Sequence, residues 1–341
     1  MTDATTPCID PTTPTMALLE RFGPRSEQSV SEPEAIAYCR GLANTHYENF
    51  SIISRLVPEE WRDDYRAVYA FCRWSDDLAD ETGRDAAARE RSLELLGWWR
   101  GELDRCFAGE ATHPVFVALA RTVRLHGVTS SGCSDGAGGG GRGALTATPF
   151  HHLIDAFEQD QRLTAYRTWD EVLGYCRLSA DPVGRIVLAL GGYADNQANA
   201  ERYRLSDRTC TALQLINFWQ DVRCDLLERD RVYIPSQETG ITPEMLREWA
   251  DRPGDPRARV PYIKALRPLV DQTAAMFEEG RALPAMLEPR LARIVHLFGM
   301  GGGATLTAVE RTGCATLWER PRLSKAQKLM LVWRVVLGAR C

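Results

Sequence analysis

Tyr69-Ala-Phe-Cys-Arg73-Trp-Ser-Asp76-Asp77-Leu-Ala-Asp80-Glu81 is the most informative stretch of this 341-residue sequence. Residues 61–81 contain neither proline nor glycine, which predicts one uninterrupted helix. On such a helix four polar side chains share one stripe: Tyr69, Arg73, Asp76 and Asp80. The two carboxylates that are four residues apart then lie about 5–6 Å from each other.

Clustered carboxylates are costly to bury, because like charges raise each other's pKa. A hard cation removes that cost, and Mg²⁺ in particular is held by carboxylates together with substrate phosphates. The first stripe therefore predicts a magnesium site. A solvated acidic helix face remains the alternative for this stretch taken alone, since acidic pairs with this spacing are common.

A second stretch, Gln214-Leu-Ile-Asn217-Phe-Trp-Gln-Asp221-Val-Arg-Cys-Asp225, repeats the pattern. Asn217, Asp221 and Asp225 are each four residues apart and again form one stripe. The residues between them are mostly apolar, which favours a stripe facing an interior cavity or groove over one facing solvent. Arg231 and Tyr233 follow shortly afterwards, before a proline that ends the element. Two such helices suggest divalent cations between them and a diphosphate as ligand.

Composition narrows the class of protein. No run of about 18 apolar residues predicts a membrane-spanning helix, and the first residues show no signal peptide. The ten cysteines are scattered without a Cys-x-x-Cys pair, which favours reduced thiols in a cytoplasmic protein. The net charge of −5 disfavours nucleic acid as a partner.

The remaining pattern is helical throughout, so we expect an all-α, single-domain chain. Residues 1–30 lack periodicity and are expected to be a disordered lead to a domain spanning 31–341. The glycine-rich segment 127–148 is expected to be a flexible insertion in that domain. We expect helices over residues 31–44, 61–81, 86–107, 114–126, 149–167, 168–192, 198–228, 243–250, 261–283, 285–298, 301–314 and 324–338. Pro182 should kink the helix over 168–192.

Two further segments have competing interpretations. Gly299-Met-Gly301-Gly-Gly-Ala304 fits a dinucleotide-binding pattern, but nothing here alternates strand with helix, so a helix break or close helix packing is favoured. The last segment, 320–341, is basic and has apolar residues at helical spacing. Such a helix can lie on an anionic membrane surface, although a packed last helix is the simpler interpretation.

A site of this kind suits diphosphate chemistry. Magnesium bridged between the stripes would neutralise charge as a C–O bond breaks, and Arg73 and Arg231 would hydrogen bond the phosphate oxygens. The Tyr69 ring would stabilise a carbocation, and the apolar remainder of the cavity would hold a prenyl chain.

At this point the chain resembles the squalene/phytoene synthases, which are head-to-head prenyl synthases with an all-α isoprenoid-synthase bundle around a central cavity. The resemblance covers about residues 33–338 and is carried by the two acidic stretches and by Arg231-Val-Tyr-Ile-Pro. It implies Mg²⁺ as cofactor and prenyl diphosphates as substrates. It implies metal ligands at Asp76, Asp80, Asn217, Asp221 and Asp225, with Tyr69 and Arg73 as further catalytic residues. It implies substrate contacts at His46, Phe50, Arg73, Tyr175, Gln214, Asn217, Arg231 and Tyr233. From the residues alone, a packed or capping histidine is the favoured interpretation of His46.

Two segments resemble the hydroxysqualene synthase branch of bacterial hopanoid biosynthesis: His46-Tyr-Glu-Asn-Phe50 and Tyr175-Cys-Arg-Leu-Ser-Ala-Asp181-Pro-Val-Gly. The resemblance implies that presqualene diphosphate ionises, rearranges and captures water, without NADPH. Three features depart from that branch. Asp181 stands where the branch usually has asparagine, the spacer from Asp225 to Arg231 is unusual, and the insertion at 127–148 is not typical. The alternatives are a squalene or phytoene synthase, and, more remotely, a non-catalytic assembly protein with the same fold. Contacts with a membrane surface or with other pathway enzymes would be compatible with any of these.

Overall fold

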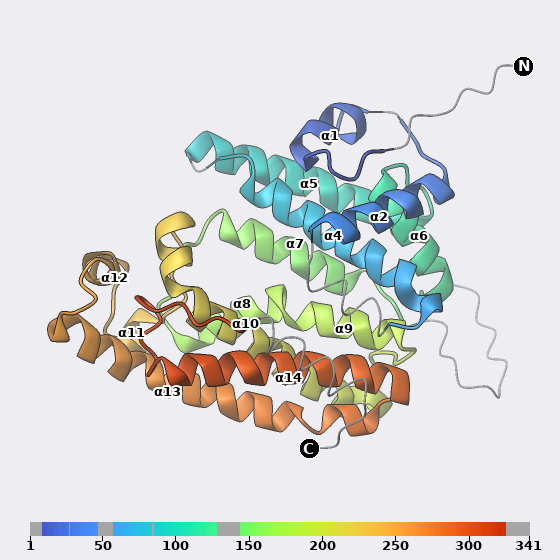
Figure 1. The fold of residues 1–341 in the computed structure, drawn as a ribbon. Coiled ribbons are helices and arrows are strands. Elements are labelled where there is room, and N and C mark those ends of the chain that lie inside the picture. Colours follow the sequence, from blue (N-terminus) through green and yellow to red (C-terminus); the bar gives the residue numbers. More distant parts are fainter. Residues whose placement is uncertain (1–8, 27, 47–56, 84, 128–143, 325–341) are drawn as a thin grey trace, which may run out of the picture. The chain divides into compact units, whose positions relative to one another are not determined.

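The computed structural model describes residues 9–26, 28–46, 57–83, 85–127 and 144–324 (Figure 1). Within these ranges the regular elements are helices, with two isolated β-bridges and no strand, so the all-α class is confirmed. Contacts divide the chain into two compact units, Met1–Gln161 with Ile186–Asp195, and Arg162–Arg185 with Asn196–Cys341. No helix in the described residues is both long and apolar enough to cross a membrane.

The first unit is built around α4, which carries the first acidic stripe. Its buried face holds Phe71 and Trp74, and Trp74 stacks on Trp99 of α5 with ring centroids 5.3 Å apart. Phe116 of α6 and Phe150 of α7 complete this aromatic core against Phe71. The helices of the unit are α1 (Thr15–Phe22), α2 (Glu32–His46), a 3₁₀ turn (Glu59–Trp61), α4 (Arg62–Asp80), α5 (Ala86–Ala108), α6 (Pro114–His126) and α7 (Thr148–Asp160).

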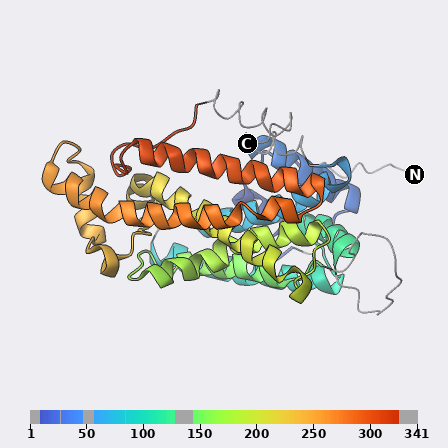
Figure 2. The same cartoon turned by 90° about the horizontal axis from the view of Figure 1, so that it is seen from below.

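The second unit is built around α10, the longest helix described, which carries the second acidic stripe. Trp219 of α10 is fully buried and donates its indole N–H to Thr273 of α13 at 2.9 Å. Figure 2 shows α13 and α14 running side by side in this unit. Its helices are α8 (Trp169–Ser179), a 3₁₀ turn (Gln197–Asn199), α10 (Ala200–Glu228), α11 (Ser236–Thr239), α12 (Pro243–Ala250), α13 (Pro256–Gly280), a 3₁₀ turn (Leu283–Met286) and α14 (Pro289–Arg311).

Helix α9 (Asp181–Leu190) follows α8 after a break at Ala180, where a kinked continuous helix had been expected. Pro182 stands in the first turn of α9, where a missing backbone N–H costs nothing. The proline therefore starts a new helix, and α9 continues from the second unit into the first.

Helix α1 is the main difference from the disordered lead expected over residues 1–30. Leu18 and Phe22 are buried, and the Thr15 hydroxyl donates to Asp77 of α4 at 2.5 Å. An eight-residue helix is marginal alone, so these tertiary contacts account for its formation.

Helix α14 contradicts the expected break between residues 298 and 301, because it runs without interruption through the glycines. The alternative of close packing holds at Gly302, where an added Cβ would meet Leu213 of α10 at 2.6 Å and also collide with Phe277. The helix predicted over 324–338 and most of the insertion at 127–148 lie outside the described residues.

Candidate active site

The first acidic stripe lies on α4 within the first unit, as the spacing predicted. The exposed fraction of the side chains rises along the stripe. Tyr69 and Arg73 are half-buried, the Asp76 side chain is 49% exposed and Asp80 is exposed. The stripe therefore begins against the protein and ends where its carboxylates can reach a ligand.

Arg73 lies among three carboxylates rather than beside the stripe alone. Its guanidinium is 3.5 Å from Asp76 and 3.7 Å from Glu81, and it also forms an ion pair with Asp77. Three carboxylates around one guanidinium leave an excess of acidic groups here, which a bound cation would offset.

Asp77 is a site residue that the sequence did not single out. It is 4% exposed, and it accepts from the Thr15 hydroxyl and pairs with Arg73. Burial raises the pKa of this carboxyl above its ordinary value, while these two partners act in the opposite direction. Because Asp77 points inward and holds Arg73, we assign it a positioning role.

Buried hydrogen bonds fix the orientation of α4. The indole N–H of Trp74 donates to the Tyr38 hydroxyl at 2.9 Å, and that of Trp99 donates to the Ser75 hydroxyl at 3.0 Å. Tyr38, Trp74 and Trp99 are all 2% exposed or less. Rotation of α4 would break both bonds, so the stripe is held in a single orientation within its unit.

The second acidic stripe lies on α10 within the second unit. Asn217 is exposed, the Asp221 side chain is 24% exposed and that of Asp225 is 6% exposed, while Gln214 is half-buried. Exposure therefore falls along this stripe and ends at a buried carboxylate.

Asp221 interrupts the regular helix, with φ of −108° and ψ of 15°. Its carboxylate accepts from the Arg320 guanidinium at 2.6 Å, and the neighbouring Gln220 donates to the carbonyl oxygen of Pro321 at 2.7 Å. The segment after α14 thus returns to α10 and brings a positive charge to the second stripe. This contact joins residues 99 positions apart, so helical spacing gives no sign of it.

The Asp225 carboxylate is paired with Arg229 at 3.2 Å. Burial raises its pKa to about 6; Arg229 and Arg231 act to lower the pKa, and Asp221 acts to raise it. A charged Asp225 is therefore costly in this unit, and a divalent cation beside it would offset that cost.

Arg231-Val-Tyr-Ile-Pro follows α10 as an extended segment whose Val232 N–H donates to the carbonyl oxygen of Thr164 at 2.8 Å. Tyr233 is buried and stacks on Phe218 of α10, with ring centroids 3.6 Å apart. Tyr175 of α8 lies 5.6 Å from Tyr233 by the same measure. The structure thus brings these two predicted substrate-binding tyrosines together, in the aromatic core beneath the second stripe.

His46 is the last residue of α2, and its side chain is not among those described; Phe50 lies outside the described residues. For these two positions the proposed substrate contact stays a prediction.

The oxygen donors of the two stripes suit a magnesium ion whose coordination is completed by substrate phosphates. Among the residues that the structure describes, no cluster of three or more His, Cys, Asp or Glu side chains is placed to hold a metal alone. Each stripe offers two carboxylates and an arginine, and magnesium is commonly bound by one or two carboxylates with substrate phosphates supplying further oxygens. Asp225 is buried and costly to charge, and this favours a cation bound at the second stripe.

Comparison with known proteins agrees with this pair of acidic helices. The family model described as squalene/phytoene synthase matches residues 43–327 of the chain. A hydroxysqualene synthase of Zymomonas mobilis is 28% identical over 306 residues, which is 85% of this chain and 88% of that protein. A phytoene synthase of Thermus thermophilus is 28% identical, and the match covers 91% of this chain and 94% of the relative.

Solved structures support the fold. A squalene synthase from Alicyclobacillus acidocaldarius is 39% identical, with a TM-score of 0.66 and coverage of 83% of this chain and 95% of that chain. A dehydrosqualene synthase shares the fold at 19% identity, with a TM-score of 0.70. The protein is therefore an all-α synthase that acts on prenyl diphosphates. It belongs to the squalene/phytoene synthase family.

Proposed function

We propose that the protein is a hydroxysqualene synthase, which converts presqualene diphosphate to hydroxysqualene and diphosphate in the presence of Mg²⁺. The observation that carries the diphosphate chemistry is the pair of helices α4 and α10, each with two aspartates four residues apart and an arginine paired to one of them or to its neighbour. For the particular reaction, the support is the similarity to the hydroxysqualene synthases of Zymomonas mobilis and of Rhodopseudomonas palustris, the latter 30% identical over 241 residues.

In this proposal each stripe contributes to binding the diphosphate. Bound magnesium would supply positive charge that stabilises the departing diphosphate. Asp76, Asp80, Asp221 and Asp225 would hold the metal, with Asn217 as a further oxygen donor. Arg73 and Arg231 would donate charge-assisted hydrogen bonds to phosphate oxygens.

The reaction then needs little further chemistry from side chains. The C–O bond of presqualene diphosphate breaks and its electron pair leaves with the diphosphate. The cyclopropylcarbinyl cation rearranges to an open chain, and a water oxygen bonds to the cationic carbon and releases one proton. The half-buried Tyr69 ring on α4 would lie with the cation and stabilise it through its π face. The reaction therefore needs no hydride donor.

The alternative is a squalene or phytoene synthase that condenses two prenyl diphosphates head to head. It is favoured by the 39% identity to the Alicyclobacillus acidocaldarius squalene synthase and by the coverage of the Thermus thermophilus phytoene synthase. A non-catalytic assembly role is the remote alternative, and Asp225 argues against it, since a buried carboxylate is costly to charge without a bound cation.

The test uses purified protein with Mg²⁺ and, in separate reactions, presqualene, farnesyl and geranylgeranyl diphosphate, each with and without NADPH. Mass spectrometry identifies the products. We expect hydroxysqualene from presqualene diphosphate in both cofactor conditions. Squalene formed only with NADPH, or phytoene from geranylgeranyl diphosphate, would assign the protein to the sister activity instead.

A further inference from the structure

The Ser179 hydroxyl, at the last residue of α8, is a buried polar group that the proposed chemistry does not yet use. Its oxygen is buried and has no hydrogen-bond partner among the residues that the structure describes. Buried hydroxyls are normally hydrogen-bonded, so one that lacks a partner indicates a bound water or a functional role.

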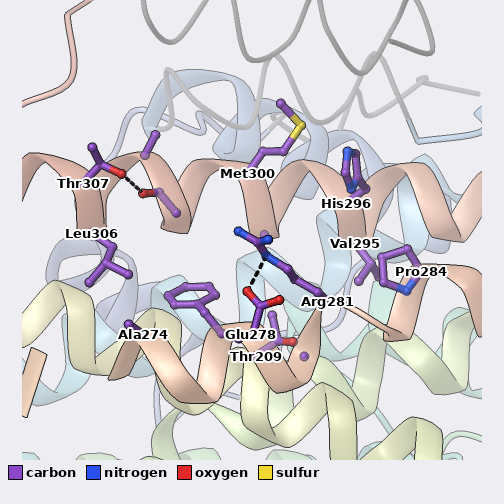
Figure 3. A pocket seen from close by; sticks show the side chains of 15 residues that line it. Thr209, Ala274, Glu278, Arg281, Pro284, Val295, His296, Met300, Leu306 and Thr307 are labelled. Carbon is purple, nitrogen blue, oxygen red and sulfur yellow. Dashed lines mark hydrogen bonds and ion pairs between the residues drawn. The ribbon is translucent and has the colours of Figure 1, made fainter. Parts of the chain in front are cut away.

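Other helix hydroxyls of the second unit are satisfied by the backbone. Thr209 of α10 donates to the carbonyl oxygen four residues earlier at 3.0 Å. Thr307 of α14 makes the same kind of bond at 2.9 Å, beside the pocket between α13 and α14 (Figure 3). Ser179 has the carbonyl oxygen of Tyr175 at the same spacing and does not bond to it. Local helix geometry therefore does not account for the Ser179 hydroxyl.

Two contacts with α10 locate Ser179 within the second unit. Tyr175 of α8 packs on Phe218 of α10, with ring centroids 6.0 Å apart. Asp181, at the start of α9, accepts from the Thr211 hydroxyl of α10 at 2.8 Å. Residue numbers rise along α8 and α9 as they fall along α10, so Ser179 lies between these two contacts.

The turn of α10 at this level holds Gln214, which is half-buried and is a predicted substrate contact. Ser179 also lies one turn after Tyr175 on the same face of α8, and Tyr175 is a second predicted substrate contact. The hydroxyl is therefore flanked by a predicted substrate contact on its own helix and by another on the helix opposite.

Asp181 supplies a further oxygen at the break between α8 and α9. It is 5% exposed, and among the described residues the Thr211 hydroxyl donates to one of its two carboxylate oxygens. A buried water needs at least two polar partners. The Ser179 hydroxyl and the second oxygen of Asp181, two residues apart at the same helix break, provide two.

We propose that Ser179 holds the water that captures the carbocation, with the second oxygen of Asp181 as the other partner of that water. Both oxygens can accept, so the water donates its two hydrogens to them and keeps a lone pair for the cation. When the water oxygen bonds to the cationic carbon, it loses one proton, which passes to the released diphosphate, a base that the reaction itself supplies. This inference rests on the proposed function, because it concerns the step in which water is captured.

The ratio of alcohol formed to diphosphate released tests the role of the hydroxyl. Ser179→Val and Ser179→Thr introduce side chains of nearly the same shape, and only threonine keeps a hydroxyl. Each variant is incubated with presqualene diphosphate and Mg²⁺ without NADPH. We expect Ser179→Val to release diphosphate but to form roughly tenfold less alcohol for each diphosphate, because a cation without a positioned water loses a proton and becomes a hydrocarbon. Ser179→Thr should keep the wild-type ratio.

Ser206→Ala is the matched control for this ratio. It removes a buried hydroxyl of α10 in the same unit, one that hydrogen bonds to the Cys210 thiol, and it should keep the wild-type ratio. A defect in folding alone would slow the release of diphosphate and leave the ratio unchanged.

Two results would overturn the role of Ser179 while the proposed function stands. One is a wild-type ratio in Ser179→Val, and the other is an equal loss of alcohol in Ser179→Val and Ser179→Thr. A wild-type protein that forms no alcohol from presqualene diphosphate would instead refute the proposed function, and this inference with it.

Discussion

The free energy of unfolding should fall as pH rises because Asp181 is buried in the second unit, and Asp181→Asn should remove this fall. Asp181 begins α9, is 5% exposed, and accepts from the Thr211 hydroxyl of α10 at 2.8 Å. Burial raises the pKa of Asp181 to about 7 from an ordinary 3.8, and the nearby Asp207 adds to the effect. Thr211 and the nearby Arg185 and Arg177 act in the opposite direction without cancelling it.

The sign follows from proton binding. Between pH 3.8 and about 7 the folded state holds a proton on Asp181 that the unfolded state has lost, so the free energy of unfolding falls as pH rises through this window. A shift of one pKa unit corresponds to about 1.36 kcal/mol, so the loss between pH 5 and pH 8 is roughly 2–3 kcal/mol for this group. Asparagine keeps an acceptor for Thr211 and cannot ionise, so the variant should not show that loss.

Urea unfolding of the wild-type protein and of Asp181→Asn at pH 5 and pH 8 measures the difference. We expect the free energy of unfolding of the variant, relative to that of the wild type, to be roughly 2–3 kcal/mol higher at pH 8 than at pH 5. Asp170→Asn makes the same chemical change at an exposed position of α8 and should follow the wild type. Parallel pH profiles for Asp181→Asn and the wild type would refute the reasoning.

Three further substitutions test other parts of the structure. Asp221→Ala should abolish Mg²⁺-dependent turnover of presqualene diphosphate and leave the far-ultraviolet circular dichroism nearly unchanged; Asp251→Ala, at an 85% exposed side chain, should keep activity. Thr15→Val removes a donor to buried Asp77 and should lower the free energy of unfolding by about 1–3 kcal/mol, measured in urea. Gly302→Leu should cost about 1–3 kcal/mol by overpacking, seen as a lower melting temperature than that of Gly301→Leu.

Helical periodicity predicted the elements that carry the stripes, because α4 and α10 are long and hold their aspartates at a constant spacing. It failed where tertiary contacts override local preference. Helix α1 depends on contacts such as that between Thr15 and Asp77. Helix α14 tolerates glycines that would weaken an isolated helix, since Gly302 allows close packing on its neighbours.

The candidate site likewise combines residues that helical spacing predicts with residues that only tertiary contacts bring into place. Residue type and spacing placed Asp76 and Asp80 on one helix and Asp221 and Asp225 on another. The inward orientation of Asp77 and the approach of Arg320 to Asp221 join residues far apart in sequence, so periodicity has no means of showing them. The burial that raises the pKa of Asp225 likewise depends on how the second unit packs.

The most direct measurement of the proposed reaction is the fate of presqualene diphosphate in water labelled with heavy oxygen, with Mg²⁺ and without NADPH. Capture of the cation by water predicts an alcohol that carries one labelled oxygen, together with one diphosphate for each molecule formed. No conversion under these conditions, or an alcohol whose oxygen is unlabelled, would contradict the proposal.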